Sequence, residues 1–190
     1  MDFKNCELEH VILEGNSRGY APRVIHYIDN LKILVVGSES GQITLWNFED
    51  VPKVYFRLTE KNTIRCISSL TYGGKTYLLS AVDKNVIVYL FKNKIPVQET
   101  ILPGATFVNH LLYDSKSAKL YILYWFSAII EYDLRSNFKS FQMINTDLFG
   151  LKPPNATMEL LEDGKMAVEH GGGLSILVPN SLMVTHCSTY

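Results

Sequence analysis

Hydrophobic and polar residues alternate most clearly around residues 37–47, GSESGQITLWN. An aliphatic run enters this stretch, small turn residues follow, and Ile43 and Leu45 then alternate with polar neighbours. A period of two is typical of a half-buried strand, and Gly with Ser is typical of a tight turn. The stretch therefore predicts a strand, a turn and a second strand.

The same order of short strands recurs along the chain in four units. No segment shows helical periodicity over more than a few residues, so we expect an all-β fold. The expected strands are 24–28, 32–36, 42–48 and 53–58; 64–70, 76–81, 85–91 and 97–102; 107–113, 119–124, 128–134 and 139–144; and 158–161, 165–169, 174–178 and 182–187.

The units follow one another at a fixed spacing. Trp46, Tyr89 and Tyr132 occupy the equivalent place in three units, and each lies 43 residues after the one before. In the fourth unit the same step falls within two residues of Leu177. A period in the forties with four short strands is typical of β-propeller blades. We expect about four blades, with approximate boundaries at 23–59, 63–102, 106–145 and 156–190.

Composition indicates the class of protein and its cellular compartment. The chain has 190 residues, 47% of them apolar, and a formal net charge of −1. This predicts a globular chain without an overall attraction to nucleic acid or to anionic membranes. The three cysteines, Cys6, Cys66 and Cys187, favour a reducing compartment, which is the cytoplasm or the nucleus. No apolar run approaches the ~20 residues that a membrane helix needs.

Residues 37–47 carry a resemblance to the WD40-repeat family, with weaker copies at 80–90 (SAVDKNVIVYL) and 127–133 (SAIIEYD). The Trp-Asp pair of the family stands here as Trp46-Asn47, Tyr89-Leu90 and Tyr132-Asp133, and no unit has the Gly-His pair. The resemblance implies a WD40-like propeller whose blades rest mainly on apolar packing. It also implies that interaction surfaces lie on the face that carries the blade links and the turns between second and third strands.

The number of predicted strands does not decide whether these blades close into a ring by themselves. Residues 7–15 alternate well enough to form one leading strand, which comes on top of four complete units. The chain is then the first part of a longer propeller, or a partner or second copy supplies the missing blades, or four blades close by themselves. An open arc exposes apolar blade faces and sheet edges, so it needs something to pack against.

The candidate binding residues lie on the link face that the resemblance implies. Trp125 and Phe126 stand where the other units have polar turn residues, and exposed aromatic residues are enriched in binding hot spots. The alternative is that they fold back as core. Together with basic and aromatic residues of the links, they form a set that would bind an acidic peptide or RNA phosphate. The set is Arg18, Tyr20, Lys61, Arg65, Trp125 and Phe126, and we expect Arg23 near it.

No catalytic or metal-binding pattern is present in the sequence. The five histidines and three cysteines lack metal-ligand spacing, so neither a metal nor a cofactor is expected. A hydrolytic propeller would need converging carboxylates. We expect Glu131 and Asp133 to point to opposite faces of one strand. The leading interpretation is a non-catalytic protein–protein interaction scaffold within a larger complex. An RNA-associated propeller is the alternative, and a glycan- or small-molecule-binding propeller is a third class.

Overall fold

The computed structural model describes residues 21–47, 52–104, 106–125, 128–145, 157–170, 173–179 and 183–189. These residues form β-strands joined by turns, with two short 3-10 segments, η1 (Asp29–Leu31) and η2 (Leu134–Ser136). The described residues contain no α-helix, and therefore none that could span a membrane. The all-β prediction is confirmed.

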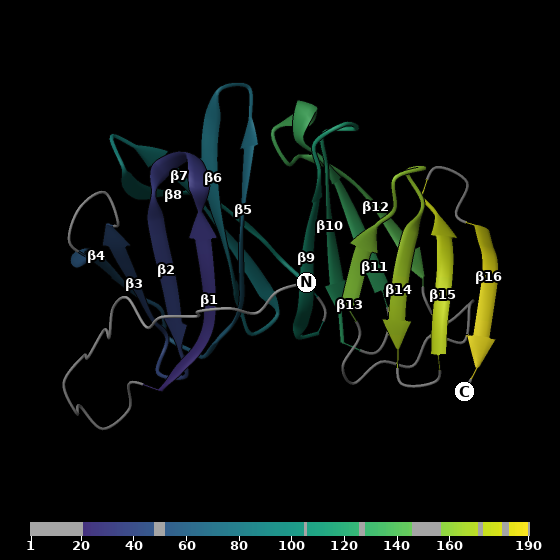
Figure 1. The fold of residues 1–190 in the computed structure, drawn as a ribbon, viewed down its shortest axis with the longest axis horizontal. Helices are drawn as coiled ribbons and strands as arrows, with labels where there is room; N and C mark the ends of the chain where they lie inside the picture. The colour runs from purple at the N-terminus through teal and green to yellow at the C-terminus, as the bar shows by residue number, and fades with distance from the viewer. Residues whose placement is uncertain are drawn as a thin grey trace, which may run out of the picture.

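In the part of the chain that the structure describes, sixteen strands form four antiparallel sheets, and in each sheet four consecutive strands lie in sequence order (Figure 1). The first sheet comprises β1 (Pro22–Ile28), β2 (Ile33–Ser38), β3 (Gln42–Asn47) and β4 (Lys53–Thr59). The second comprises β5 (Ile64–Tyr72), β6 (Lys75–Val82), β7 (Asn85–Lys92) and β8 (Ile95–Leu102). The third comprises β9 (Val108–Asp114), β10 (Lys119–Tyr124), β11 (Ala128–Asp133) and β12 (Ser140–Asn145). The fourth comprises β13 (Thr157–Leu160), β14 (Met166–His170), β15 (Gly173–Val178) and β16 (Met183–Thr189).

The repeat seen in the sequence is kept in the register of the strands. Trp46, Tyr89 and Tyr132 each occupy the fifth position of the third strand of their sheet, and all three side chains are buried. Leu177 takes this position in β15 and is buried as well. Each of these described strands begins and ends within two residues of its predicted position. The leading strand expected at 7–15 lies outside the described residues.

Among the described residues, three apolar cores hold the sheets together, one at each boundary between neighbouring sheets. Alternate residues of a central strand serve opposite cores, because strand side chains alternate between faces. Leu78 of β6 packs toward the first sheet, whereas Tyr77 and Leu79 pack toward the third. Met166 and Leu123 belong to the core between the third and fourth sheets. Each fully buried Leu or Ile contributes about 1.5–3 kcal/mol, so apolar packing dominates the contact between sheets.

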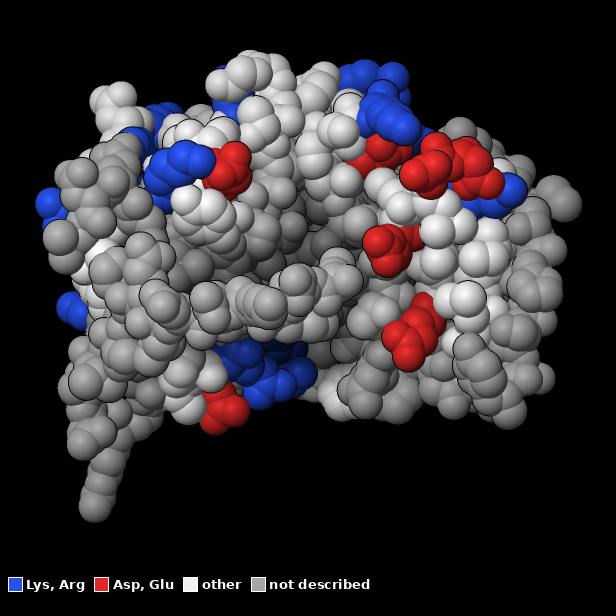
Figure 2. All heavy atoms as spheres, in the orientation of Figure 1, with Lys and Arg blue, Asp and Glu red and all other residues white. Residues whose placement is uncertain are grey.

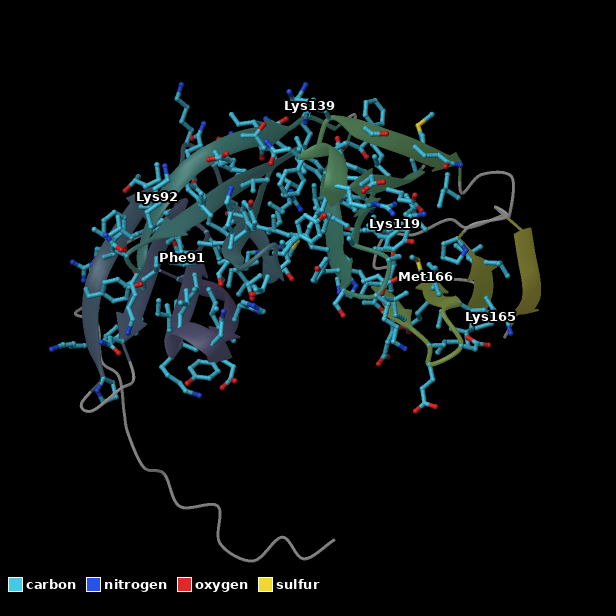
Figure 3. All side chains as sticks on the ribbon, turned by 90° about the horizontal axis from the view of Figure 1, so that it is seen from above. Phe91, Lys92, Lys119, Lys139, Lys165 and Met166 are labelled. Atoms are coloured by element: carbon cyan, nitrogen blue, oxygen red, sulfur yellow. The ribbon has the colours of Figure 1, made fainter. Side chains whose placement is uncertain are left out.

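The first strands of neighbouring sheets lie side by side, with contacts between β1 and β5, β5 and β9, and β9 and β13. Seen from above, the four sheets follow one another along an arc (Figure 3). Among the described strands, none of the fourth sheet pairs with a strand of the first.

Candidate interaction site

Turns and links meet at one end of the sheets, which we call the link face. It comprises residues 39–41, 60–63, 83–84, 103–104 and 106–107 and Trp125. The link from β4 to β5 is tied to the turns of both sheets that it joins. The Thr63 hydroxyl donates to the carbonyl oxygen of Glu39 in the first sheet (2.8 Å). The Asn62 amide donates to the carboxylate of Asp83 in the second sheet (2.5 Å).

The link from β8 to β9 is tied down in the same way. The backbone N–H of Val108 donates to the carbonyl oxygen of Asp83 (3.1 Å). The Thr106 hydroxyl donates to the carbonyl oxygen of Trp125, in the turn after β10 (2.6 Å). Because both links are bonded at two points, side chains on this face are held by well-positioned backbone.

A cluster of one cation and two aromatic rings lies on the link face. The Arg65 guanidinium carbon is 3.9 Å from the centre of the Phe107 ring and 5.9 Å from that of Trp125. The two rings are 5.6 Å apart and tilted by 43°. Phe107 is 38% exposed, and Arg65 and Trp125 are half-buried. Such stacking is worth about 0.5–1 kcal/mol at an exposed site. We call these three residues the Arg65 cluster.

The structure brings together two of the predicted binding residues, Arg65 and Trp125. Lys61 is exposed on the link from β4 to β5. Arg18, Tyr20 and Phe126 lie outside the described residues. Figure 2 shows a group of basic side chains beside an acidic one at the lower edge of the molecule, on the side where the links lie, and further basic side chains along the upper edge.

The positions of Arg23 and Phe107 differ from expectation. Arg23, expected near Trp125, instead forms an ion pair with Glu39 of its own sheet (3.3 Å). Phe107 was expected inside a strand, but β9 begins at Val108 and leaves the Phe107 ring on the surface. An apolar residue just before a strand gives no sequence signal of exposure, and only its neighbours in space identify it as part of the cluster.

Cys66, the neighbour of Arg65 in β5, is half-buried, and Tyr89 of β7 is buried. Cys66 packs against the core between the second and third sheets, and burial raises the pKa of its thiol to about 12, although the charge of Arg65 opposes this shift. The hydroxyl of Tyr89 donates to the Glu60 carboxylate of the link. Burial, followed by this bond, raises the pKa of Tyr89. Neither group is a nucleophile at neutral pH.

The two acidic residues of β11 are each paired with a basic side chain. The prediction that Glu131 and Asp133 point to opposite faces is wrong, because residues two apart in a strand share a face. Each has its own cation: Lys119 lies 2.7 Å from Glu131, and Arg135 lies 2.7 Å from Asp133. The hydrogen bonds from Arg135 lower the pKa of Asp133. Within the described residues, no group of three or more His, Cys, Asp or Glu side chains could hold a metal ion.

Comparison with protein-family models and with curated proteins finds no match to this chain.

Proposed function

We propose that this chain is a non-catalytic protein–protein interaction scaffold, a WD40-like subunit of a larger complex in the cytoplasm or the nucleus. The observation that carries this proposal is the Arg65 cluster. It presents a cation and two aromatic rings on the link face, and Arg and aromatic side chains are the commonest anchors of protein interfaces. The cluster fits a partner segment with a carboxylate beside an apolar group.

We also propose a finer fold assignment. The sheets are blades of a β-propeller, and the described residues form an arc of it. Four features support it. Each sheet is a four-stranded meander, the first strands lie side by side, the period is 43 residues in three units, and the sheets follow an arc in Figure 3. A meander of four strands repeated around an axis is the propeller arrangement.

An arc also needs a neighbour for its first sheet. Val24, His26 and Ile28 of β1 are more buried than the residues between them, and His26 bonds Ser69 of the second sheet (2.8 Å). Ile25 and Tyr27 therefore point away from the second sheet, and they are 67% and 45% exposed. This apolar row supports a protein partner, or a further propeller segment, packed against the first sheet.

Affinity capture with matched variants tests the function. Arg65→Ser and Phe107→Ser each remove one member of the cluster, whereas Lys92→Ser removes a charge on the outer side of the arc, where Figure 3 labels Lys92. We expect a stoichiometric protein partner to be captured by wild type and by the Lys92 variant, and to be lost from the two cluster variants. Equal capture by all four proteins would refute the assignment of the site.

RNA is the second candidate ligand, because stacked aromatic rings beside Arg65 and the exposed Lys61 also suit bases and phosphates. Nuclease treatment separates the two. If the ligand is RNA, capture disappears after treatment and weakens steeply with salt. If it is a protein, capture survives nuclease.

A further inference from the structure

A pocket of about 220 Å³ lies at the end of the sheets opposite the link face, between the second and third sheets. The hairpin turn between β5 and β6 forms one side, and η2 with the turn after it forms the other (Figure 1). The lining residues are Tyr72, Gly73, Lys75, Tyr77, Leu134, Arg135, Asn137 and Phe138. None of them belongs to the link face, so the pocket is separate from the site described above.

The pocket combines an aromatic floor with a cationic rim. Tyr77 and Phe138 are buried and meet edge to face, with ring centres 5.8 Å apart and planes at 80°. The only charged side chains among the lining residues are Lys75 and Arg135, and both are exposed. The Nε and Nη2 groups of Arg135 donate to the Asp133 carboxylate, which leaves Nη1 of Arg135 for a ligand. No ion pair connects Lys75 to another described residue.

The turn that carries Phe138 is held in an unfavourable conformation. Asn137 and Phe138 have φ of 55° and 64°, in the left-handed region that bulky residues avoid. The N–H of Lys139 donates to the carbonyl oxygen of Ser136 (3.3 Å), which closes a turn where Gly is the usual second residue. A Phe in this region is unfavourable, because its Cβ atom lies too close to the following carbonyl oxygen. Burial of the phenyl group against Tyr77 offsets this cost and forms the floor of the pocket.

From this combination we propose that the pocket binds a peptide segment in which an aromatic side chain is flanked by carboxylates. The volume is below the roughly 300–1,000 Å³ of sites for drug-sized ligands, so it suits one side chain rather than a large cofactor. Tyr77 and Phe138 stack with the inserted ring, since aromatic pairs prefer offset and edge-to-face contacts. Lys75 and Arg135 bind the flanking carboxylates, and the exposed Asn137 amide is a further donor.

Two-dimensional NMR of the labelled chain tests the proposal with three short capped peptides. The first has one phenylalanine flanked by glutamates, the second has alanine in place of phenylalanine, and the third has lysines in place of glutamates. We expect the first peptide alone to shift the amide signals of Gly73, Gly74 and Asn137 in a saturable manner. Lys75→Glu should weaken this binding about fivefold. Lys116→Glu, which changes the same charge at an exposed turn outside the pocket, should leave it unchanged.

Several results would overturn the proposal. Equal binding of the alanine peptide would show that the aromatic floor is not used, and equal binding of the lysine peptide would exclude the cationic rim. Absence of shifts in the wild-type chain at millimolar peptide would exclude the pocket as a peptide site. The NMR spectra of the two variants must show that both are folded. Shifts confined to residues 60–63 and Trp125 would assign such peptides to the link face instead.

Discussion

Trp125 occupies in the third sheet the place that Glu39 occupies in the first. The N–H of Glu39 donates to the carbonyl oxygen of Ala21, the residue just before β1 (3.1 Å). The N–H of Trp125 makes the same bond to Phe107, the residue just before β9 (2.6 Å). Glu39 is paired with Arg23, whereas Trp125 lies beside Arg65. The turn thus accepts a carboxylate or an indole, and the fold does not require the aromatic group.

Replacement of Trp125 by Glu should therefore leave the fold intact and abolish partner capture. The half-buried indole contributes about 1 kcal/mol, which the new carboxylate partly recovers by pairing with Arg65. Urea denaturation and the capture assay measure the two effects. A loss of more than about 3 kcal/mol would instead identify Trp125 as a core residue.

Gly104 is required by close packing of the link from β8 to β9 against Tyr124. A Cβ atom at this position would overlap the Tyr124 ring and lie 2.5 Å from the carbonyl oxygen of Lys84. Gly104→Ala should cost about 1–3 kcal/mol in the free energy of unfolding, or more, because neither the buried ring nor the backbone can move away.

Gly74→Ala is the matched control for this change. Gly74 has φ of 74° and no atom within 4 Å of the added methyl group, so only the backbone preference is lost, about 1–2 kcal/mol. Denaturant titration should rank Gly104→Ala as the more damaging of the two, and the opposite ranking would contradict the steric explanation.

The Lys119–Glu131 ion pair should stabilise the third sheet only while both partners are present. Their side chains are 16% and 9% exposed, and Figure 3 labels Lys119 beside the boundary between the third and fourth sheets. Lys119→Met leaves a buried carboxylate without its cation and should cost about 3 kcal/mol. The double variant Lys119→Met/Glu131→Gln removes both charges and should recover most of the loss in thermal and urea unfolding. No recovery would show that the lysine stem, rather than its charge, matters.

His110 should make stability depend on pH. Its Nδ1 accepts a hydrogen bond from the N–H of Met158 in the fourth sheet (2.8 Å), and burial lowers the pKa of the imidazole. Because the pKa of His110 is lower in the folded state, its contribution to stability is complete above the unfolded-state pKa of about 6.5. This contribution is lost as the pH falls through the folded-state pKa. The free energy of unfolding should fall by at most about 1.4 kcal/mol per pH unit from this group.

Comparison of wild type with His110→Gln isolates this contribution, because His26 and all other titratable groups are the same in both proteins. The Gln amide oxygen can accept the hydrogen bond from the Met158 N–H, but the amide does not take up a proton as the pH falls. Urea denaturation at pH 7.5, 6.5 and 5.5 should give a shallower decline for the variant. Identical slopes would show that His110 does not couple folding to protons.

The strand pattern was predictable because it is local. Alternation around Ile43 and Leu45 requires no knowledge of distant residues, and the column of Trp46, Tyr89 and Tyr132 repeats at the spacing of one sheet. Burial of this column follows from the period of two, since the third strand of each sheet has a neighbouring strand on both sides.

The candidate site was predictable only in part. Trp125 was predicted because it breaks a pattern of polar turn residues, and Arg65 because it closely follows a blade link, one residue after the start of β5. Phe107 was missed, since its exposure depends on where β9 begins. The ion pair between Lys119 and Glu131 was missed as well, because it joins neighbouring strands diagonally rather than directly.

The sequence by itself determined an all-β chain of four repeated units, with its strands and central buried column, because hydrophobic alternation encodes strands within a few residues. Only the tertiary structure decided which side chains meet across sheets. In the structure, Arg65 stacks on Phe107, Arg23 pairs with Glu39, and a pocket lies between Lys75 and Phe138. These contacts join residues far apart in the chain, and their geometry depends on how whole sheets pack, which no local pattern specifies.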